Sequence, residues 1–425
     1  MKRRIKEETL IFFSVSKWII LSVLVGCLVG GSSSVFLTAL NWLSNEASGL
    51  HRNYFFLLPF VLFLSSLSIK FLAPDAEGHG TEKVIEAIHR NEGIIKLAVV
   101  PVKLIATIFT IAFGGSAGKE GPCAQIGAAI SSSFARLLRL DAHDRKKLVI
   151  CGISAGFSSV FGTPLAGALF GVEVLFVGRI HYDVMLPSFI AGVISYNVSS
   201  AFGIQYDYHT FTSPLKFSPV LFYEILLAGI FFGICSFFLI EMIHIGKKLS
   251  GKINIWSPLK GFLGGAVLIT VALLFSTDYL GLGLKNIESA LNGQDVPWYA
   301  FILKSFTTCI TLNFGGSGGI VTPIFFVGSS AGNIFAQVLN LDIALFSALG
   351  FVGLLAGSAN TPISASIMAV EVFGTHIAPY AALVCVISFL MTGHRSIFPS
   401  QILAFRKSKM IDIELGKEIS EVKSD

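Results

Sequence analysis

The amino-acid sequence predicts an all-α integral membrane protein in which one structural unit is repeated. Charged residues make up 13% of the chain, against roughly 25% in soluble domains, and 53% of the residues are apolar. Several apolar runs approach or exceed the roughly 20 residues that a helix needs to cross a bilayer. A glycine-rich segment at 113–122 also recurs at 314–323, which indicates two copies of one unit.

The chain opens with a polar segment at 1–16, and the first apolar run, 18–42, follows it. This run continues too far for a cleaved signal peptide, so we interpret it as the first transmembrane helix. Further membrane helices are predicted at 54–72, 98–113, 148–176, 220–243 and 262–275. The runs 320–338 and 346–357 are short for full spans and indicate tilted, broken or re-entrant helices.

The charges in the loops predict the orientation. Basic residues concentrate near the N-terminus and in 136–147 and 247–260, which marks these segments as cytoplasmic. The loops 206–214 and 292–298 contain few basic residues and are predicted on the outer side. The net charge of +5 therefore does not indicate nucleic-acid binding. The six cysteines stand singly in apolar stretches, which is typical of packing residues.

A polar insert at 74–83 contains Gly78-His79-Gly80 and opens a predicted helix at 81–89. This helix carries Glu86 and His89 at a spacing that carboxylate-bridged metal sites use. The sequence has no second copy of this pair, so we favour a solvated helix face and predict neither a metal nor a cofactor.

The repeat extends beyond the glycine-rich segments. A lysine precedes each copy at the same distance, as Lys103 and Lys304. A Thr-Pro pair follows each copy, and a glutamate comes nine residues after each proline, as Glu173 and Glu371. The repeat therefore spans at least 103–173 and 304–371.

Glycine-rich breaks between membrane helices expose backbone N–H groups where water is scarce, which is tolerated only beside a cavity or a ligand. Two helix N-termini that face each other would form an anion site. Glu120 is unusual there, because a carboxylate can compete with the anion for one position and withdraw when it is protonated. The alternative is an ion pair with Lys119 at an aqueous rim. The uncharged Val321 at the matching place favours a gate.

The matched charges have two interpretations each. Lys103 and Lys304 either raise the electrostatic potential of a pore without lining it, which we favour, or extend to a membrane interface. Glu173 and Glu371 serve either as hydrogen-bond acceptors in the fold, which we favour, or in transport.

Enzyme motifs find no support. A phosphate-binding loop needs Gly-x4-Gly-Lys-Ser/Thr, whereas Phe113 stands at its first position here and Glu120 at its last. Gly-x-Ser-x-Gly and His-Glu-x-x-His do not occur. We therefore predict a protein that is not an enzyme.

Three motifs together resemble the CLC chloride channels and chloride/proton exchangers: Gly-Lys-Glu-Gly-Pro at 118–122, Gly-Gly-Ile-Val-Thr-Pro at 318–323 and Thr-Pro-Leu-Ala-Gly at 163–167. The resemblance implies an inverted-topology repeat of about 18 helical segments with re-entrant half-helices, and one pore per subunit in a homodimer. It places this domain at 17–405, with repeats at about 17–203 and 218–405 and a short charged cytoplasmic tail at 406–425. The CBS domains of many members are not expected here.

The resemblance also implies roles for individual residues. Glu120 matches the external gating glutamate, and the backbone of Lys119, Glu120 and Gly121 would contribute to an outer anion site. The backbone at Gly319, Ile320 and Val321 would hold the central ion. His79 replaces the family's usual serine beside that ion, and Phe398 replaces the usual tyrosine.

Two departures concern coupling and selectivity. Exchangers generally have an internal glutamate where this chain has Val174, as channels do, although some exchangers lack it. The segments 113–118, 162–174 and 359–361 resemble the fluoride/proton antiporter branch, whereas Pro122 and Ile320 are of the chloride type. His79 is either a ligand that adds pH dependence or a neutral histidine hydrogen-bonded at a helix entrance.

We therefore predict a homodimeric, multi-pass cell-membrane protein that passes chloride or another small anion, gated by Glu120, with lipid and no nucleic acid as partners. The alternative within transport is proton-coupled antiport of chloride or fluoride. A membrane sensor that binds an anion without transporting it is the alternative from another class.

Overall fold

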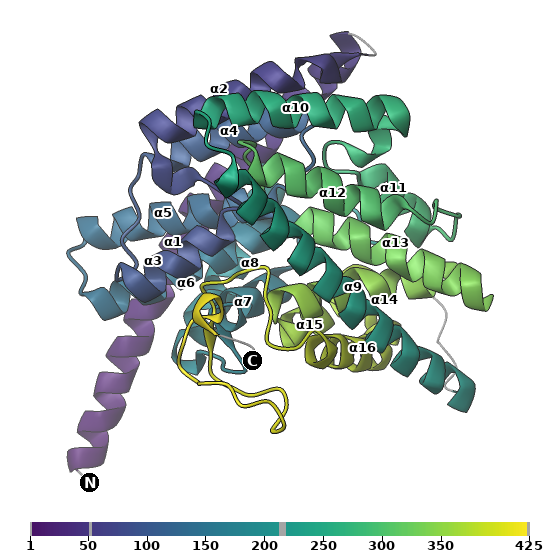
Figure 1. Cartoon of the computed structure of the whole chain (residues 1–425). Helices are drawn as coiled ribbons and strands as arrows, with labels where there is room; N and C mark the ends of the chain where they lie inside the picture. Colours follow the sequence, from purple (N-terminus) through teal and green to yellow (C-terminus); the bar gives the residue numbers. More distant parts are fainter. Residues whose placement is uncertain (1, 51–52, 212–217, 423–425) are drawn as a thin grey trace.

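The structure is a computed structural model that describes residues 2–50, 53–211 and 218–422 (Figure 1). Within these ranges the chain forms sixteen α-helices, which confirms the predicted all-α class. The first half contributes α1 (Lys2–Leu50), α2 (Leu58–Leu72), α3 (Thr81–Arg90), α4 (Val99–Ala112), α5 (Glu120–Leu137), α6 (Ala142–Phe161), α7 (Pro164–Glu173) and α8 (Tyr182–Ala201).

The second half contributes α9 (Pro219–Lys252), α10 (Ser257–Leu274), α11 (Leu284–Leu291), α12 (Ala300–Asn313), α13 (Val321–Leu339), α14 (Ile343–Ala359), α15 (Pro362–Phe373) and α16 (Ala378–Met391). Its helices correspond in order to those of the first half. The first glycine-rich segment joins α4 to α5, and the second joins α12 to α13. Pro164 and Pro362 begin α7 and α15, where proline lacks only an N–H that would have no partner inside the helix.

Among the described residues, six helical segments are long and apolar enough to cross a membrane, namely α8, α9, α10, α13, most of α1, and α2 together with the 3-10 turn before it. Shorter apolar helices, such as α4, α7, α14 and α15, fill the spaces between them. The prediction that 320–338 is short for a span is not met, because α13 has 19 residues and qualifies by length and composition. α14, at 17 residues, does not reach that length.

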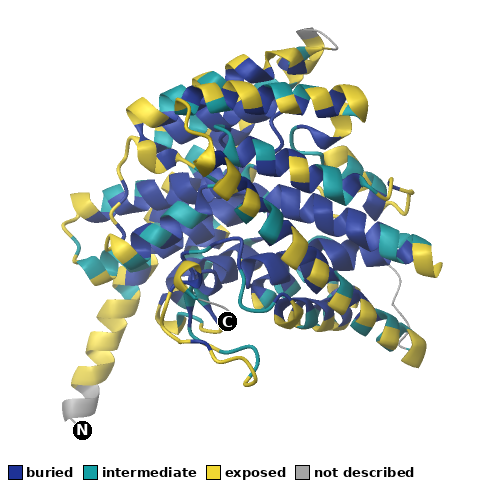
Figure 2. Ribbon diagram, in the orientation of Figure 1, coloured by how far each residue is buried: buried dark blue, intermediate teal, exposed yellow. Residues whose placement is uncertain are grey.

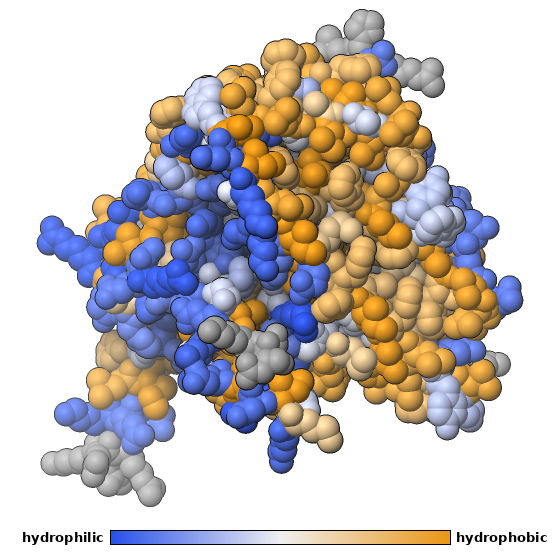
Figure 3. All heavy atoms as spheres, in the orientation of Figure 1, coloured by the Kyte–Doolittle hydropathy of each residue, from blue (hydrophilic) through white to orange (hydrophobic). Residues whose placement is uncertain are grey.

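Buried residues concentrate in the middle of the molecule, where α5, α6, α13 and α14 lie against one another (Figure 2). Exposed residues are mostly at the periphery and include many large apolar side chains, as a surface in contact with lipid requires. Figure 3 shows hydrophilic residues gathered around α3 and the C-terminal segment, with apolar residues on α9 and α10 beside them. We call this polar surface, which includes the basic residues Lys83 and Arg90 of α3 and Arg406 of the C-terminal segment, the basic face.

Ion pairs join segments that the charge pattern predicts on one side of the membrane. Lys17 pairs with Asp144, and Arg145 pairs with Glu92. The predicted outer loop 206–214 lies only partly in the described chain, since 212–217 fall outside it. Its described part reaches Gly162, whose carbonyl accepts a hydrogen bond from a tyrosine of the loop.

The two ends of the chain differ from expectation. The polar segment at 1–16 is not separate from the first membrane helix, because α1 continues without interruption from Lys2 to Leu50. The predicted tail at 406–425, whose last three residues lie outside the described chain, folds back onto the basic face. Two of its three isoleucines, Ile413 and Ile419, are buried there with Leu403.

A short parallel sheet holds this C-terminal segment in place. β2 (Ile402–Leu403) pairs with β1 (Phe176–Val177), which follows α7. The Arg90 side chain donates hydrogen bonds to Glu418, so the segment is also attached to α3. The apolar contacts of two isoleucines and one ion pair therefore order a tail that composition alone shows as charged.

Candidate anion site

The two glycine-rich segments lie side by side, as predicted. Gly118 donates its N–H to the carbonyl of Gly319 at 2.7 Å, and Gly319 donates to Gly118 at 2.6 Å. This antiparallel bridge joins the two breaks directly, and it places the first turns of α5 and α13 next to each other. One consequence concerns Gly319, a predicted anion ligand. Its N–H already has a carbonyl partner, so the site must draw on the residues that follow.

Threonine hydroxyl groups form hydrogen bonds with the backbone of both glycine-rich breaks. Thr110 accepts a hydrogen bond from the N–H of Ser317, and Thr311 accepts one from the N–H of Ser116. The hydroxyl of each serine also contacts a threonine of the opposite half. The Ser317 hydroxyl lies 2.9 Å from that of Thr107, and the Ser116 hydroxyl lies 3.0 Å from that of Thr308. Each half therefore supplies the polar partners that the other half's irregular backbone needs.

Glu120 is buried, with 1% of its surface exposed, and its carboxylate does not point toward water. Oε2 accepts the N–H of Thr322 at 3.1 Å, and Oε1 accepts the hydroxyl of Thr322 at 2.6 Å. The carboxylate therefore occupies the N-terminus of α13, where the unpaired N–H groups of the first turn favour a negative charge. A negative charge is favoured at this position by the start of the helix.

The alternative of a rim ion pair is not what the geometry favours. Lys119 precedes α5 as its N-cap and is half-buried. Among the described ion pairs, none joins Lys119 to Glu120. The carboxylate instead reaches across to the second half of the chain.

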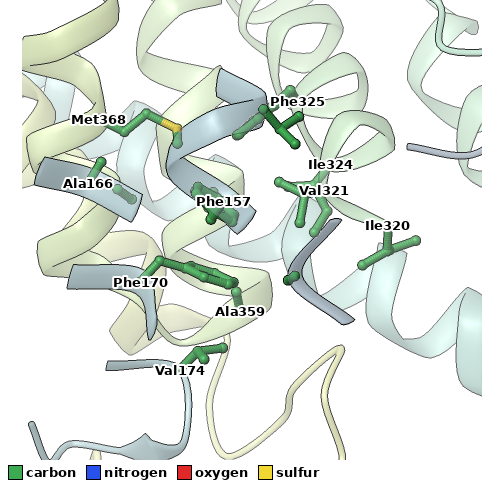
Figure 4. Packing of buried hydrophobic residues seen from close by; sticks show 14 of the residues in the cluster. Phe157, Ala166, Phe170, Val174, Ile320, Val321, Ile324, Phe325, Ala359 and Met368 are labelled. Carbon is green, nitrogen blue, oxygen red and sulfur yellow. The ribbon is translucent and has the colours of Figure 1, made fainter. Parts of the chain in front are cut away.

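The N–H groups of Ile320 and Val321 begin α13 and have no partner inside the helix. Figure 4 shows apolar side chains packed around this helix start, among them Phe157, Phe170 and Phe325. Phe157 stacks on Phe170 with ring centroids 4.2 Å apart. An anion here would thus meet backbone dipoles in surroundings with a low dielectric constant, where each dipole acts strongly.

A third helix begins at the same place. Gly80 is the N-cap of α3, and its φ of +84° suits glycine. A Cβ on Gly121 would lie 2.1 Å from the carbonyl oxygen of His79, and one on Gly319 would lie 2.8 Å from the nitrogen of Gly121. The starts of α3, α5 and α13 therefore touch one another, and the glycines at 80 and 121 permit that approach.

The two predicted side-chain ligands also come together. The rings of His79 and Phe398 are 5.5 Å apart, and Phe398 is fully buried. Nδ1 of His79 is buried and has no hydrogen-bond partner within the described structure. Nδ1 of His79 is therefore available to a bound ligand, and this outcome differs from a histidine satisfied by a hydrogen bond at the helix entrance.

A cavity of about 420 Å³ leads from the basic face to His79. We call it the vestibule. Its walls come from the loop before α3, from α3 itself, from α9 and α10, and from the segment after α16. The charged and histidine side chains that line it are Glu77, His79, Glu82, Lys83, Glu86, His244, Lys247 and Lys260.

The matched lysines do not extend to a membrane interface, because both are fully buried. Lys103 donates to the carbonyls of Ala76 and Gly78, at 3.0 and 2.6 Å. Lys304 donates to the carbonyls of Tyr279 and Gly281, at 3.4 and 2.8 Å. Each lysine therefore fixes the loop that leads to α3 or to α11.

The matched glutamates form reciprocal caps. Glu173, at the end of α7, accepts the N–H groups of Ile363 and Ser364 in the first turn of α15. Glu371 near the end of α15 accepts those of Leu165 and Ala166 in the first turn of α7. The structural interpretation of these glutamates is therefore supported.

The metal interpretation of Glu86 and His89 finds no support. Glu86 pairs with Lys83 and Arg90, and His89 contacts the carbonyl of Leu175. Within the described residues no group of three potential metal ligands comes together.

Sequence reasoning missed the partners of two carboxylates. Thr322 holds Glu120, and Ser400 holds Glu82 through its N–H at 3.1 Å and its hydroxyl at 2.6 Å. Thr322 lies in the motif at 318–323, which is recognised by its glycines and its proline and not by its threonine. Ser400 lies 318 residues from Glu82, with no pattern to connect them.

Helix N-termini that face each other inside a membrane, a carboxylate in the anion's place and a polar vestibule define a membrane protein that handles small anions. A model of the family described as voltage gated chloride channel matches residues 60–393. Because this match spans most of the chain, the protein belongs to the voltage-gated chloride channel, or CLC, family.

Relatives support this assignment over nearly the full length. The chain is 34% identical over 396 residues to a chloride/fluoride channel protein of Pseudomonas syringae pv. tomato, which covers 91% of this chain and 86% of that protein. It is 25% identical over 381 residues to the H(+)/Cl(-) exchange transporter ClcA of Klebsiella pneumoniae, covering 83% and 80%.

Solved structures agree with the fold. A CLC-type fluoride/proton antiporter matches with a TM-score of 0.87 at 26% identity, covering 92% of this chain and 99% of that one. A slow cyanobacterial Cl-/H+ antiporter matches with a TM-score of 0.77 at 21% identity, covering 88% and 94%. The second likeness supports the fold alone.

Proposed function

We propose that this protein transports a small anion, chloride in the first instance, across the cell membrane and that Glu120 is the gate of its pathway. The observation that carries the proposal is the position of the Glu120 carboxylate on the N-terminus of α13, held by both the N–H and the hydroxyl of Thr322. Because that position favours any anion, carboxylate and substrate exclude each other. Protonation of Glu120 would release it and open the pathway.

The proposed pathway runs from the vestibule to the helix starts. An anion in the vestibule meets His79, whose buried Nδ1 has no partner in the described chain. It then reaches the N–H groups of Ile320 and Val321, and finally the place that Glu120 now occupies. Lys119 and Gly121 contribute only through the backbone at the start of α5. At the helix starts the proposed ligands are backbone N–H groups and not formal positive charges, so the ion is able to leave again.

The second candidate function is proton-coupled antiport of chloride or fluoride. It is favoured by the likeness to the fluoride/proton antiporter, which holds over 92% of this chain. Val174, in place of an internal glutamate, favours a channel, since it offers no proton-accepting group there. Either mode uses Glu120, which binds a proton and competes with the anion in both.

We propose that the protein works as a homodimer with one pathway in each subunit. The resemblance to the family implies this arrangement. It is supported by Leu165 and Ile363, which occupy matched places at the starts of α7 and α15 and are each 46% exposed on the outside of the helix pair. We also propose that the basic face, with the vestibule mouth, is cytoplasmic, because short basic loops remain inside.

The test is purified protein in liposomes with a chloride gradient, and then a fluoride gradient, with anion efflux and internal pH recorded together. A channel releases anion without moving protons, whereas an antiporter drives protons against their gradient. Glu120→Gln should raise anion efflux and remove the part of its pH response that comes from protonation of the gate. Glu46→Gln, which changes an exposed carboxylate of α1, is the matched control. Efflux and pH response that stay unaltered in Glu120→Gln would refute the gate.

A further inference from the structure

The vestibule contains a second carboxylate, half-buried, that the proposed pathway does not use. Glu82 is in the first turn of α3 and lines the cavity together with His79. Within the described residues the hydrogen bonds of its carboxylate come from Ser400, whose N–H and hydroxyl lie 3.1 and 2.6 Å from Oε1. Among the described ion pairs, none includes Glu82.

The other charges around the vestibule are largely committed. Lys83 pairs with Glu86 at 2.9 Å, and Lys260 donates to the carbonyl of Ser250 at 2.7 Å. The remaining groups that face the cavity are Glu77 and His79 from the loop before α3, and His244 and Lys247 from α9. The charge of Glu82 therefore has no dedicated counter-ion and acts on the whole cavity.

Burial raises the pKa of Glu82 to about 7, against the opposing effects of the Ser400 hydrogen bonds and of Lys247. α3 is amphipathic and is not one of the apolar helices that cross the membrane. Its exposed side faces the basic face, so protons can reach this carboxyl from the adjoining solution. The charge in the vestibule would thus change within the ordinary range of cellular pH.

We propose that Glu82 controls how readily an anion enters the pathway from the basic face: the neutral carboxyl admits the anion, and the ionised carboxylate repels it. This inference rests on the proposed function and adds a second proton-dependent residue to it. Glu82 acts on the entry of the anion into the vestibule, whereas Glu120 remains the gate. A single charge in a confined, poorly solvated cavity changes the rate of anion arrival by about 10-fold.

The experiment separates this effect from the gate by starting from Glu120→Gln, in which the gate cannot ionise. Chloride efflux from liposomes is measured with the same pH on both sides, from about pH 5.5 to about pH 8.5, a range that brackets the midpoint of Glu82. Efflux of Glu120→Gln should rise by about 10-fold as the pH falls. In Glu120→Gln/Glu82→Gln it should stay at the high value throughout.

Two further variants make the result specific. Ser400→Ala in the same background removes one donor to the charged carboxylate, so the midpoint of the pH profile should move to higher pH. Glu77→Gln removes an exposed carboxylate of the same cavity and is the matched control, in which the pH dependence assigned to Glu82 should persist. A structural role of Glu82 alone would change the amount of folded protein and leave the shape of the pH profile unaltered.

The inference is overturned if efflux of Glu120→Gln does not depend on pH, or if the double variant keeps the same pH dependence. These failures differ from a failure of the proposed function. If the proposed function itself is wrong, the wild-type protein passes no anion, or Glu120→Gln does not change the flux.

Discussion

The hydroxyl of Thr322 offers the sharpest test of the gate, because it donates its hydrogen bond directly to the Glu120 carboxylate. It donates to Oε1 at 2.6 Å from a residue that is 2% exposed. A hydrogen bond to a charged group contributes about 1.5 to 3 kcal/mol, which corresponds to about 10- to 150-fold in an equilibrium constant. Thr322→Val keeps the shape of the side chain and removes this bond, while the N–H at 3.1 Å remains.

The closed state, in which Glu120 occupies the start of α13, should therefore lose up to about 3 kcal/mol of stability relative to the open state, in which Glu120 has withdrawn. Anion efflux from liposomes at neutral pH should rise in Thr322→Val toward the value of Glu120→Gln, which sets the upper limit. Thr322→Ser keeps the hydroxyl and should behave like the wild type. Efflux of Thr322→Val equal to that of the wild type, from protein with unchanged folding, would show that the hydroxyl does not hold the gate closed.

Three further predictions concern stability. Gly121→Ala places a Cβ 2.1 Å from the His79 carbonyl, so the thermal midpoint in detergent should fall, corresponding to about 1 to 3 kcal/mol of overpacking; an unchanged midpoint would contradict the contact. Glu173→Ala leaves the N–H groups of Ile363 and Ser364 unpaired and should lower the midpoint through a loss of about 1 to 3 kcal/mol, mostly from the buried Ser364, whereas no loss would argue against the reciprocal cap. The hydrogen-bonded Arg90 guanidinium lowers the pKa of Glu418, so this ion pair stabilises the fold above the usual glutamate range and loses its effect as the pH falls through the lowered pKa. Arg90→Gln should therefore lower the midpoint at neutral pH, by no more than about 1 kcal/mol because the arginine is half-exposed, and the difference should vanish in acid; a difference that is constant with pH would refute the assignment.

The internal repeat made much of the fold predictable. Glycine-rich segments that recur with matched lysines and glutamates indicated two units whose breaks meet, and the bridge between Gly118 and Gly319 is that meeting. Glu173 and Glu371 were predicted as hydrogen-bond acceptors for the same reason, since a residue kept in both copies has the same neighbours twice.

What the sequence left open depends on contacts between distant segments. The free or occupied state of an N–H cannot be inferred from residue type, so Gly319 was counted as an anion ligand although its N–H binds a carbonyl. The burial of Ile413 in the C-terminal segment depends on a strand formed far away, at 176–177. Thr322 was overlooked because a threonine beside proline is ordinary at a helix start.

The reciprocal caps also bear on how the chain is made. When α7 is synthesised, the N–H groups of Leu165 and Ala166 have no acceptor, because Glu371 lies 206 residues further along from Leu165. The end of α7 likewise holds a carboxylate whose donors in α15 do not yet exist. The first half of the nascent chain therefore lacks these hydrogen bonds until α15 is synthesised. The insertion of α15 then supplies the acceptor for the start of α7 and the donors for Glu173 together.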